Sequence, residues 1–124
     1  MLVSVQHTSA IALAVRQMAA AVEFYEKCGF AVIYGGPDAE FTSLRCGEAY
    51  VNLVSTPDYG QHWWGRAIFR VVSADDQHAR LVAAGLHPAA APQDASWGER
   101  YFHMTDPDGH ELSFAELLQP SARA

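Results

Sequence analysis

The sequence predicts an α+β fold made of two βαβββ modules whose strands form a cup-shaped mixed sheet. Two segments of the chain each change from a two-residue period to a helical period, and three strand-like runs follow each segment. The same interval of 18 residues separates Ile11 from Gly29 and Ala67 from Gly85, at an offset of 56 residues. Two copies of one strand–helix unit in a small chain indicate an internal duplication. Sheets covered by helices on one face leave the other face free to curl into a cup.

The first strand–helix unit begins with strictly alternating residues. One face of this predicted strand carries Ile11, Leu13 and Val15, and the other carries Ala10, Ala12 and Ala14. The spacing then becomes that of a helix, whose predicted buried face is Met18, Ala21, Val22, Tyr25 and Cys28. Gly29 is expected to end this helix, because glycine readily adopts the left-handed conformation found there.

The second unit repeats this order. Its predicted strand buries Ala67, Phe69 and Val71. Ser73 and Asp76 resemble a helix capping box, with aspartate in place of the usual glutamate. The predicted buried face of the helix is Ala74, His78, Leu81 and Val82, and Gly85 is expected to end it.

Turn signals delimit the remaining strands and the modules. Strands are expected at 30–35, 40–45 and 49–54 in the first module, and at 87–91, 98–105 and 110–115 in the second. The tetrapeptide DPDG supplies the last turn. We therefore expect a single domain over residues 1–124, with modules at about 10–54 and 66–115 joined by a loop at 55–65.

Composition excludes several classes of function. The net charge of −6 and the single lysine, Lys27, argue against nucleic-acid binding, which requires clustered basic residues. No apolar run approaches the roughly 20 residues of a membrane span, and the start of the chain lacks the pattern of a secretory signal. Cys28 and Cys46 are too few for a disulfide framework. These features predict a cytoplasmic protein with two reduced thiols.

Three stretches carry a family resemblance: AVEFYEKCGF at 21–30, WGRAIFRV at 64–71 and WGERYFHMTDPDGHEL at 97–112. They resemble the vicinal oxygen chelate superfamily, which includes glyoxalase I, extradiol dioxygenases and bleomycin-resistance proteins. The resemblance covers roughly residues 10–115. It implies paired modules around a cup-shaped pocket, and a homodimer whose subunits share their pockets.

Catalytic members of that superfamily hold a divalent metal on the first and last strands of each module. The four corresponding positions here are Ala10, Asn52, Arg66 and Ser113. Divalent metals prefer imidazole, carboxylate or thiolate ligands, and a guanidinium would bring positive charge into the cation's place. The standard metal site is therefore expected to be absent, and no cofactor is predicted.

Alternation predicts which side chains line the cup. The expected ligand-binding residues are Tyr50, Asn52, Trp63, Trp64, Arg66, Ile68, Arg70, Trp97, Glu99, Tyr101, His103, Glu111 and Ser113. His103 and Glu111 are also the candidate catalytic residues. As metal ligands these two do not complete a site, to which water or His7 could contribute. The alternative for His103 is a hydrogen bond to a carboxylate or a backbone carbonyl. His110 is predicted to be an ordinary loop histidine.

Arg66 and Arg70 have two interpretations. Glu99 or Glu111 would neutralise one of them, because a buried guanidinium is costly unless it is paired. Alternatively, a free guanidinium would receive a carboxylate, phosphate or carbonyl group of the ligand. The acidic net charge favours a cationic ligand instead.

The sequence thus favours a binding protein over an enzyme. We expect a metal-independent protein of the bleomycin-resistance type that sequesters an antibiotic or similar aromatic molecule in a homodimer. One alternative is a glyoxalase-like lyase or a dioxygenase with an unusual metal set that includes His103 and Glu111. Another is a metal-free isomerase or lyase that uses the same two residues as base and acid.

Overall fold

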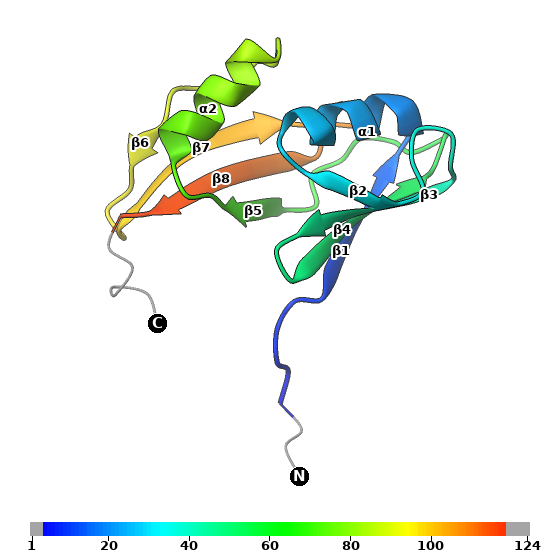
Figure 1. Ribbon diagram of the computed structural model, residues 1–124, viewed down its shortest axis with the longest axis horizontal. Helices are drawn as coiled ribbons and strands as arrows, with labels where there is room; N and C mark the ends of the chain where they lie inside the picture. The colour runs from blue at the N-terminus through cyan, green and yellow to red at the C-terminus, as the bar shows by residue number, and fades with distance from the viewer. Residues whose placement is uncertain (1–3, 119–124) are drawn as a thin grey trace. The chain divides into compact units, whose positions relative to one another are not determined.

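The computed structural model of the protein describes residues 4–118, and it divides into two compact units with the boundary between Tyr59 and Gly60. Each unit is a βαβββ module, in which one helix covers one face of a four-stranded sheet (Figure 1). The predicted α+β class and the repeated order of elements are confirmed.

The first module contains the first four strands and one helix. Its elements are β1 (Ala10–Val15), α1 (Met18–Lys27), β2 (Ala31–Tyr34), β3 (Phe41–Cys46) and β4 (Ala49–Ser55). The strand order is β1-β4-β3-β2, in which β1 runs parallel to β4 and the other neighbours are antiparallel. The strand that begins the module therefore lies beside the strand that ends it.

The second module has the same arrangement. Its elements are β5 (Arg66–Arg70), α2 (Ala74–Ala83), β6 (Gln93–Asp94), β7 (Glu99–Thr105) and β8 (Glu111–Leu117). The strand order is β5-β8-β7-β6, and β5 runs parallel to β8. Its helix packs on β7 and β8.

Both helices end in the same way. Beyond α1, the N–H of Phe30 donates to the carbonyl of Tyr25 at 3.0 Å, and beyond α2 Leu86 donates to Leu81 at 3.0 Å. A glycine precedes each donor, with φ of 107° after α1 and 84° after α2. Glycine is suited to this left-handed position because it has no side chain to clash. Within residues 4–118 no helix has the length and hydropathy needed to cross a membrane.

The predicted start of α2 is confirmed, whereas one residue of its predicted buried face is wrong. Ser73 precedes the helix, and its Oγ accepts a 3.1 Å hydrogen bond from the N–H of Asp76. Ala74 and Leu81 are fully buried. Val82 is 53% exposed, because it lies outside the helix face on which Ala74 and Leu81 are buried and His78 contacts Phe102 of β7.

Each module has its own core between helix and sheet. In the first, Leu13 and Val15 of β1 are buried, as is Tyr25 of α1. In the second, the ring of Phe114 lies 5.8 Å from that of Phe69 and 5.5 Å from that of Phe102. Strand alternation places these apolar side chains under the helix, so the polar ones lie on the opposite face of the sheet.

The predicted strand at 87–91 does not form. The only residues between α2 and β7 in strand conformation are those of β6, Gln93–Asp94. Pro88 lies within the predicted segment and Pro92 directly follows it, and proline cannot donate to a strand ladder. Ala89 still donates one backbone hydrogen bond to His103 at 3.0 Å, so the segment runs beside β7 without becoming a strand.

Candidate functional site

The open face of the second module's sheet, opposite α2, carries most of the predicted site residues. On β5, Ala67 and Phe69 are buried on the helix side, as predicted. Register places the open-face side chains in rows across β5, β8 and β7. The rows are Arg66, Glu111 and Thr105; then Ile68, Ser113 and His103; then Arg70, Ala115 and Tyr101.

Arg66 is held within the protein. Its Nη2 donates to Glu111 Oε1 at 2.9 Å, and its Nη1 donates to the carbonyl of Leu112 at 3.0 Å and to Ser113 Oγ at 3.4 Å. Both charged side chains are partly buried. The guanidinium is therefore paired with a carboxylate, which confirms the first of its two interpretations.

Arg70 belongs to a second cluster on the same face. Its Nη2 lies 3.0 Å from Glu99 Oε2, and the other carboxylate oxygen accepts a 2.7 Å hydrogen bond from Trp97 Nε1. The ring of Trp97 stacks on Tyr101, with centroids 6.2 Å apart and planes at 21°. Gln93 Nε2 donates to the Tyr101 hydroxyl at 2.7 Å. Glu99 thus fixes an aromatic pair whose outer member is 59% exposed.

His103 lies between the two clusters. Its Nδ1 is 2.7 Å from the hydroxyl of Ser113, which is only 3% exposed. The ring also contacts Tyr101, at 5.2 Å between centroids. The hydrogen-bond partner is a hydroxyl, and not the carboxylate or backbone carbonyl that the sequence suggested.

Burial lowers the pKa of His103 below its ordinary value of 6.5, and the positive charge of Arg66 lowers it further. The carboxylate of Glu111 acts in the opposite direction with a smaller effect. His103 is therefore neutral at pH 7, because desolvation and a nearby cation both disfavour the imidazolium. A neutral ring offers one hydrogen-bond donor and one acceptor.

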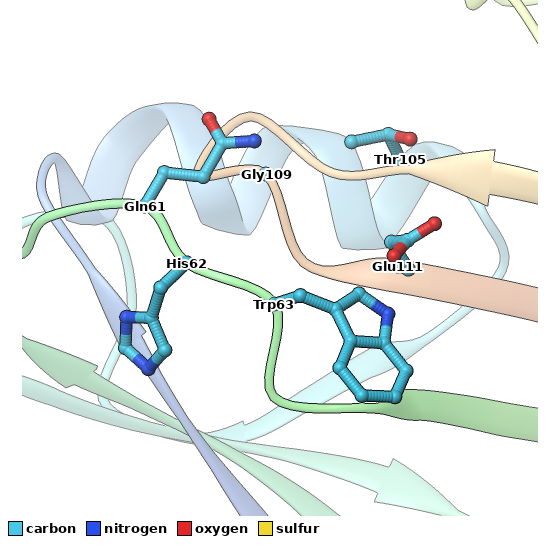
Figure 2. A pocket seen from close by; sticks show the side chains of 6 residues that line it. All are labelled: Gln61, His62, Trp63, Thr105, Gly109 and Glu111. Carbon is cyan, nitrogen blue, oxygen red and sulfur yellow. The ribbon is translucent and has the colours of Figure 1, made fainter.

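A pocket of about 490 Å³ lies at the end of this face, beside Glu111. Figure 2 shows Gln61, His62 and Trp63 of the loop before β5 on one side, and Thr105, Gly109 and Glu111 on the other. The indole of Trp63 is 75% exposed. A carboxylate and an exposed indole therefore border the same space.

One contact ties the loop to the turn between β7 and β8. Trp64 Nε1 donates to His110 Nδ1 at 2.7 Å, and the two rings meet edge to face with centroids 5.7 Å apart. His110 is 3% exposed, so the prediction of an ordinary loop histidine is wrong. Its partner lies 46 residues away in the sequence, and no local pattern indicates it.

Two predicted site residues lie in the first module. Asn52 Oδ1 accepts a 2.8 Å hydrogen bond from Ser43 Oγ on the neighbouring strand. The ring of Tyr50 receives the guanidinium of Arg45 at 5.5 Å from its centroid. Both residues lie on the same face of the sheet as Ala10 and Ala12, as their register with β1 requires.

The residues at the four positions of the family's metal ligands do not fit a divalent metal. Ala10 has no donor atom, the Arg66 guanidinium is paired with Glu111, and Asn52 and Ser113 are hydrogen-bonded to protein side chains. No buried side-chain nitrogen or oxygen among the described residues lacks a partner. Across residues 4–118 no three His, Cys, Asp or Glu side chains are grouped as metal ligands require.

Sequence reasoning missed part of the pocket. Thr105 continues the alternation of Tyr101 and His103 along β7, so the strand period would have identified it. Gln61 and Gly109 had no such signal. A Cβ atom at Gly109 would overlap the side chain of Gln61, so this contact depends on how the loop meets the turn.

The fold and the site chemistry together define a class of protein. A family model described as the Glyoxalase/Bleomycin resistance protein/Dioxygenase superfamily matches residues 5–114. The chain therefore belongs to this superfamily. No curated protein matches the chain significantly.

Solved structures of both binding proteins and enzymes are similar to it. A bleomycin resistance determinant encoded on the transposon Tn5 is 20% identical, with a TM-score of 0.76 over 90% of this chain and 98% of that one. A bleomycin-binding protein complexed with bleomycin is 21% identical, with a TM-score of 0.72 over 90% and 98%. Lactoylglutathione lyase from Agrobacterium tumefaciens is 17% identical, with a TM-score of 0.74 over 91% and 95%. At these identities the likeness shows the fold alone.

Proposed function

We propose that the protein is a metal-independent binding protein that sequesters a planar aromatic molecule, with antibiotics of the bleomycin type as the first class to test. One observation carries the proposal. Of the four residues at the family's metal positions, Ala10 has no donor atom and Asn52, Arg66 and Ser113 are hydrogen-bonded within the protein, whereas aromatic side chains of the second module remain exposed. The first property leaves no ligand set for the divalent metal that catalytic members of the family hold. The second property supports ligand binding.

Aromatic surfaces support a flat ligand. The outer face of Trp97 is available beyond its stack on Tyr101, and Trp63 borders the pocket. An aromatic stack contributes about 0.5–1.5 kcal/mol beyond the area that it buries. Each of these aromatic surfaces, with the polar groups beside it, is typical of a site that binds an organic molecule without changing it.

Charge supports a cationic or neutral ligand over an anionic one. Arg66 and Arg70 each have a carboxylate partner, so neither guanidinium offers an unpaired fork to an anion. Glu111 borders the pocket, and the chain carries a net charge of −6. An acidic protein attracts cations over a distance set by the ionic strength.

The mechanism is stoichiometric removal of the free molecule, with no bond made or broken. The proposed assembly is a homodimer, as the family resemblance implies, and the proposed location is the cytoplasm. A reducing compartment fits Cys28 and Cys46, which are both free thiols. Resistance to the bound antibiotic would then depend on the concentration of the protein.

Fluorescence titration tests the binding of the ligand. All three tryptophans lie between residues 63 and 97 in the second module, so their emission reports on the proposed site. Bleomycin and other flat antibiotics should quench it saturably, both in chelator and in added Ni²⁺, Zn²⁺ or Mn²⁺. Trp63→Ala and Trp97→Ala should each weaken binding about three- to tenfold, while Val82→Ala on α2 should not. Absence of binding across the panel, or binding only with metal, would refute the proposal.

A metal-free enzyme is the second candidate, and one observation favours it. His103 is neutral and its Nδ1 is 2.7 Å from Ser113, so the imidazole is oriented for general acid–base work. Register places Glu111 opposite Thr105, one row away from His103. Turnover of a carbonyl substrate in chelator, lost in His103→Gln with binding retained, would support this candidate. Binding without turnover would favour sequestration.

A further inference from the structure

Two hydrogen-bond acceptors on neighbouring strands border the pocket of about 490 Å³. Register pairs Glu111 of β8 directly with Thr105 of β7, and Figure 2 shows both side chains on the same side of the pocket. The Cβ atoms of directly paired residues lie about 4.5–5.5 Å apart. A ligand group between them therefore reaches a carboxylate and a hydroxyl together.

Only one of the two carboxylate oxygens of Glu111 is used within the described part of the chain. Oε1 accepts the 2.9 Å hydrogen bond from Arg66 Nη2. Within residues 4–118 no group donates to Oε2, and the Thr105 hydroxyl has no hydrogen bond. A carboxylate has about four lone-pair sites, so Glu111 can accept from Arg66 and from a ligand at the same time. Its side chain is 34% exposed, so a ligand can reach it.

Arg66 is engaged with β8 and is not among the described residues that line the pocket. Its Nη1 donates to the Leu112 carbonyl and to Ser113 Oγ, and its Nη2 donates to Glu111. What this ion pair presents to the pocket is therefore a carboxylate oxygen. The surrounding module is also acidic, because residues 60–118 contain eight Asp or Glu and four Arg, a formal charge of 4 − 8 = −4. Such a charge attracts cations from a distance.

Trp63 adds an aromatic surface to the same pocket. Its side chain is 75% exposed, and Figure 2 shows its indole projecting from the loop toward the strand that carries Glu111. The loop is attached to the β7–β8 turn by the 2.7 Å hydrogen bond from Trp64 to His110. Among aromatic side chains, indole attracts a cation over its face most strongly. The carboxylate oxygen and the indole therefore suit the same positively charged group.

We propose that this pocket is a subsite for a protonated alkylamine, which donates to Glu111 Oε2 and to the Thr105 hydroxyl while its methylene groups lie against Trp63. The proposal rests on the proposed function, because it adds an amine subsite to the site that binds the planar ring. It narrows the ligand to planar molecules that carry a basic side chain. An ammonium group has three donors and no acceptor, so it matches a pocket bordered by free acceptors. A carboxylate or phosphate group would instead meet the Glu111 carboxylate.

Two probes of equal size test the subsite. 3-(Naphthalen-1-yl)propan-1-amine and 3-(naphthalen-1-yl)propan-1-ol share one ring and one chain, and only the amine is charged at pH 7. Calorimetry should show that the wild-type protein binds the amine about five- to tenfold more tightly than the alcohol. This ratio is the gain expected from a partly exposed ion pair together with a cation over an indole.

Substitutions then locate the preference for the amine. Glu111→Gln keeps an acceptor for Arg66 but replaces Oε2 by an amide group, so the preference should fall below about twofold. Thr105→Val and Trp63→Ala should each reduce it about two- to threefold. Asp76→Asn is the matched control, because it removes the same charge from α2, on the other face of the sheet, and should keep the wild-type preference.

A double variant excludes repulsion by Arg66 as the cause of the effect in Glu111→Gln. In Arg66→Met/Glu111→Gln both charges are absent, and the preference should still be lost. If the double variant regains it, the unpaired guanidinium was responsible and the subsite is overturned. If Glu111→Gln does not fold, as judged by circular dichroism, Thr105→Val still decides, because the wild-type preference must be reduced in it.

The outcomes also separate the subsite from the proposed function. Equal affinity for the two probes, no binding of either, or a preference that Asp76→Asn loses as fully as Glu111→Gln would overturn the subsite. An amine preference that depends on Glu111, without binding of bleomycin or the other flat antibiotics, would support the subsite and overturn the proposed antibiotic ligand. Binding of bleomycin together with equal affinity for the two probes would support the proposed function and overturn the subsite alone.

Discussion

Replacing Asp106 by alanine should destabilise the second module strongly, whereas replacing it by asparagine should not. One oxygen, Asp106 Oδ1, accepts hydrogen bonds from the N–H groups of Asp108 and His110, each at 2.9 Å. All three residues are at most 5% exposed, so water does not replace the lost acceptor. A hydrogen bond to a charged acceptor contributes about 1.5–3 kcal/mol. Since the two donors share one acceptor and the turn can partly relax, we expect a loss of about 3 kcal/mol.

Asp106→Asn is the matched control, because its amide oxygen occupies the same position and accepts from both donors. It loses only the charge, and we expect a cost of about 1 kcal/mol. Urea unfolding followed by tryptophan fluorescence measures both. With a slope of about 1.5 kcal/mol per M, the midpoint should fall by about 2 M for alanine and by less than about 1 M for asparagine. Equal shifts in the two variants would refute the reasoning, since they would show that the charge matters and the acceptor geometry does not.

Three other predictions follow from the described contacts. Phe114→Ala should lower the free energy of unfolding by about 3–5 kcal/mol, because its ring fills the core between two other aromatic rings, and chemical denaturation should show this loss. Gly35→Ala should be far more destabilising than Gly47→Ala in thermal unfolding. Both glycines have positive φ, but only at Gly35 would a Cβ atom meet neighbouring backbone, and equal costs would contradict this. His103 should titrate below 6.5 by nuclear magnetic resonance. Because its pKa is lower in the folded state, it stabilises the protein above pH 6.5, and this contribution is lost as the pH falls through the folded-state pKa. His103→Gln should remove that part of the pH dependence.

Local patterns were sufficient for most of the fold. The alternation in β1 and the change of period at Met18 depend only on neighbouring residues, as does the glycine that ends each helix. The strand predicted at 87–91 does not form because Pro88 and Pro92 lack the N–H groups that a strand ladder needs. The prediction that Val82 is buried is wrong, because the sheet beneath a helix decides which of its apolar residues are covered.

The site was predictable only in part. Strand alternation correctly placed Arg66, Ile68 and Arg70 on one face. It did not determine their partners, because pairing with Glu111 and Glu99 depends on strand register across the sheet. The burial and hydrogen bond of His110 could not be predicted from the sequence, since its partner Trp64 lies in a loop 46 residues earlier in the chain.

The parallel pairing of the first and last strands in each module has a consequence for biosynthesis. As the chain leaves the ribosome, β5 is the first strand of the second module to emerge. Its parallel partner β8 begins 45 residues later, at Glu111. Until then β7, the antiparallel partner of β8, also lacks this neighbour, so the module exposes apolar side chains that await a distant segment. The first module has a similar but shorter delay, since β1 begins at Ala10 and its parallel partner β4 begins at Ala49. Truncation before β8 should therefore leave a nascent chain that chaperones retain.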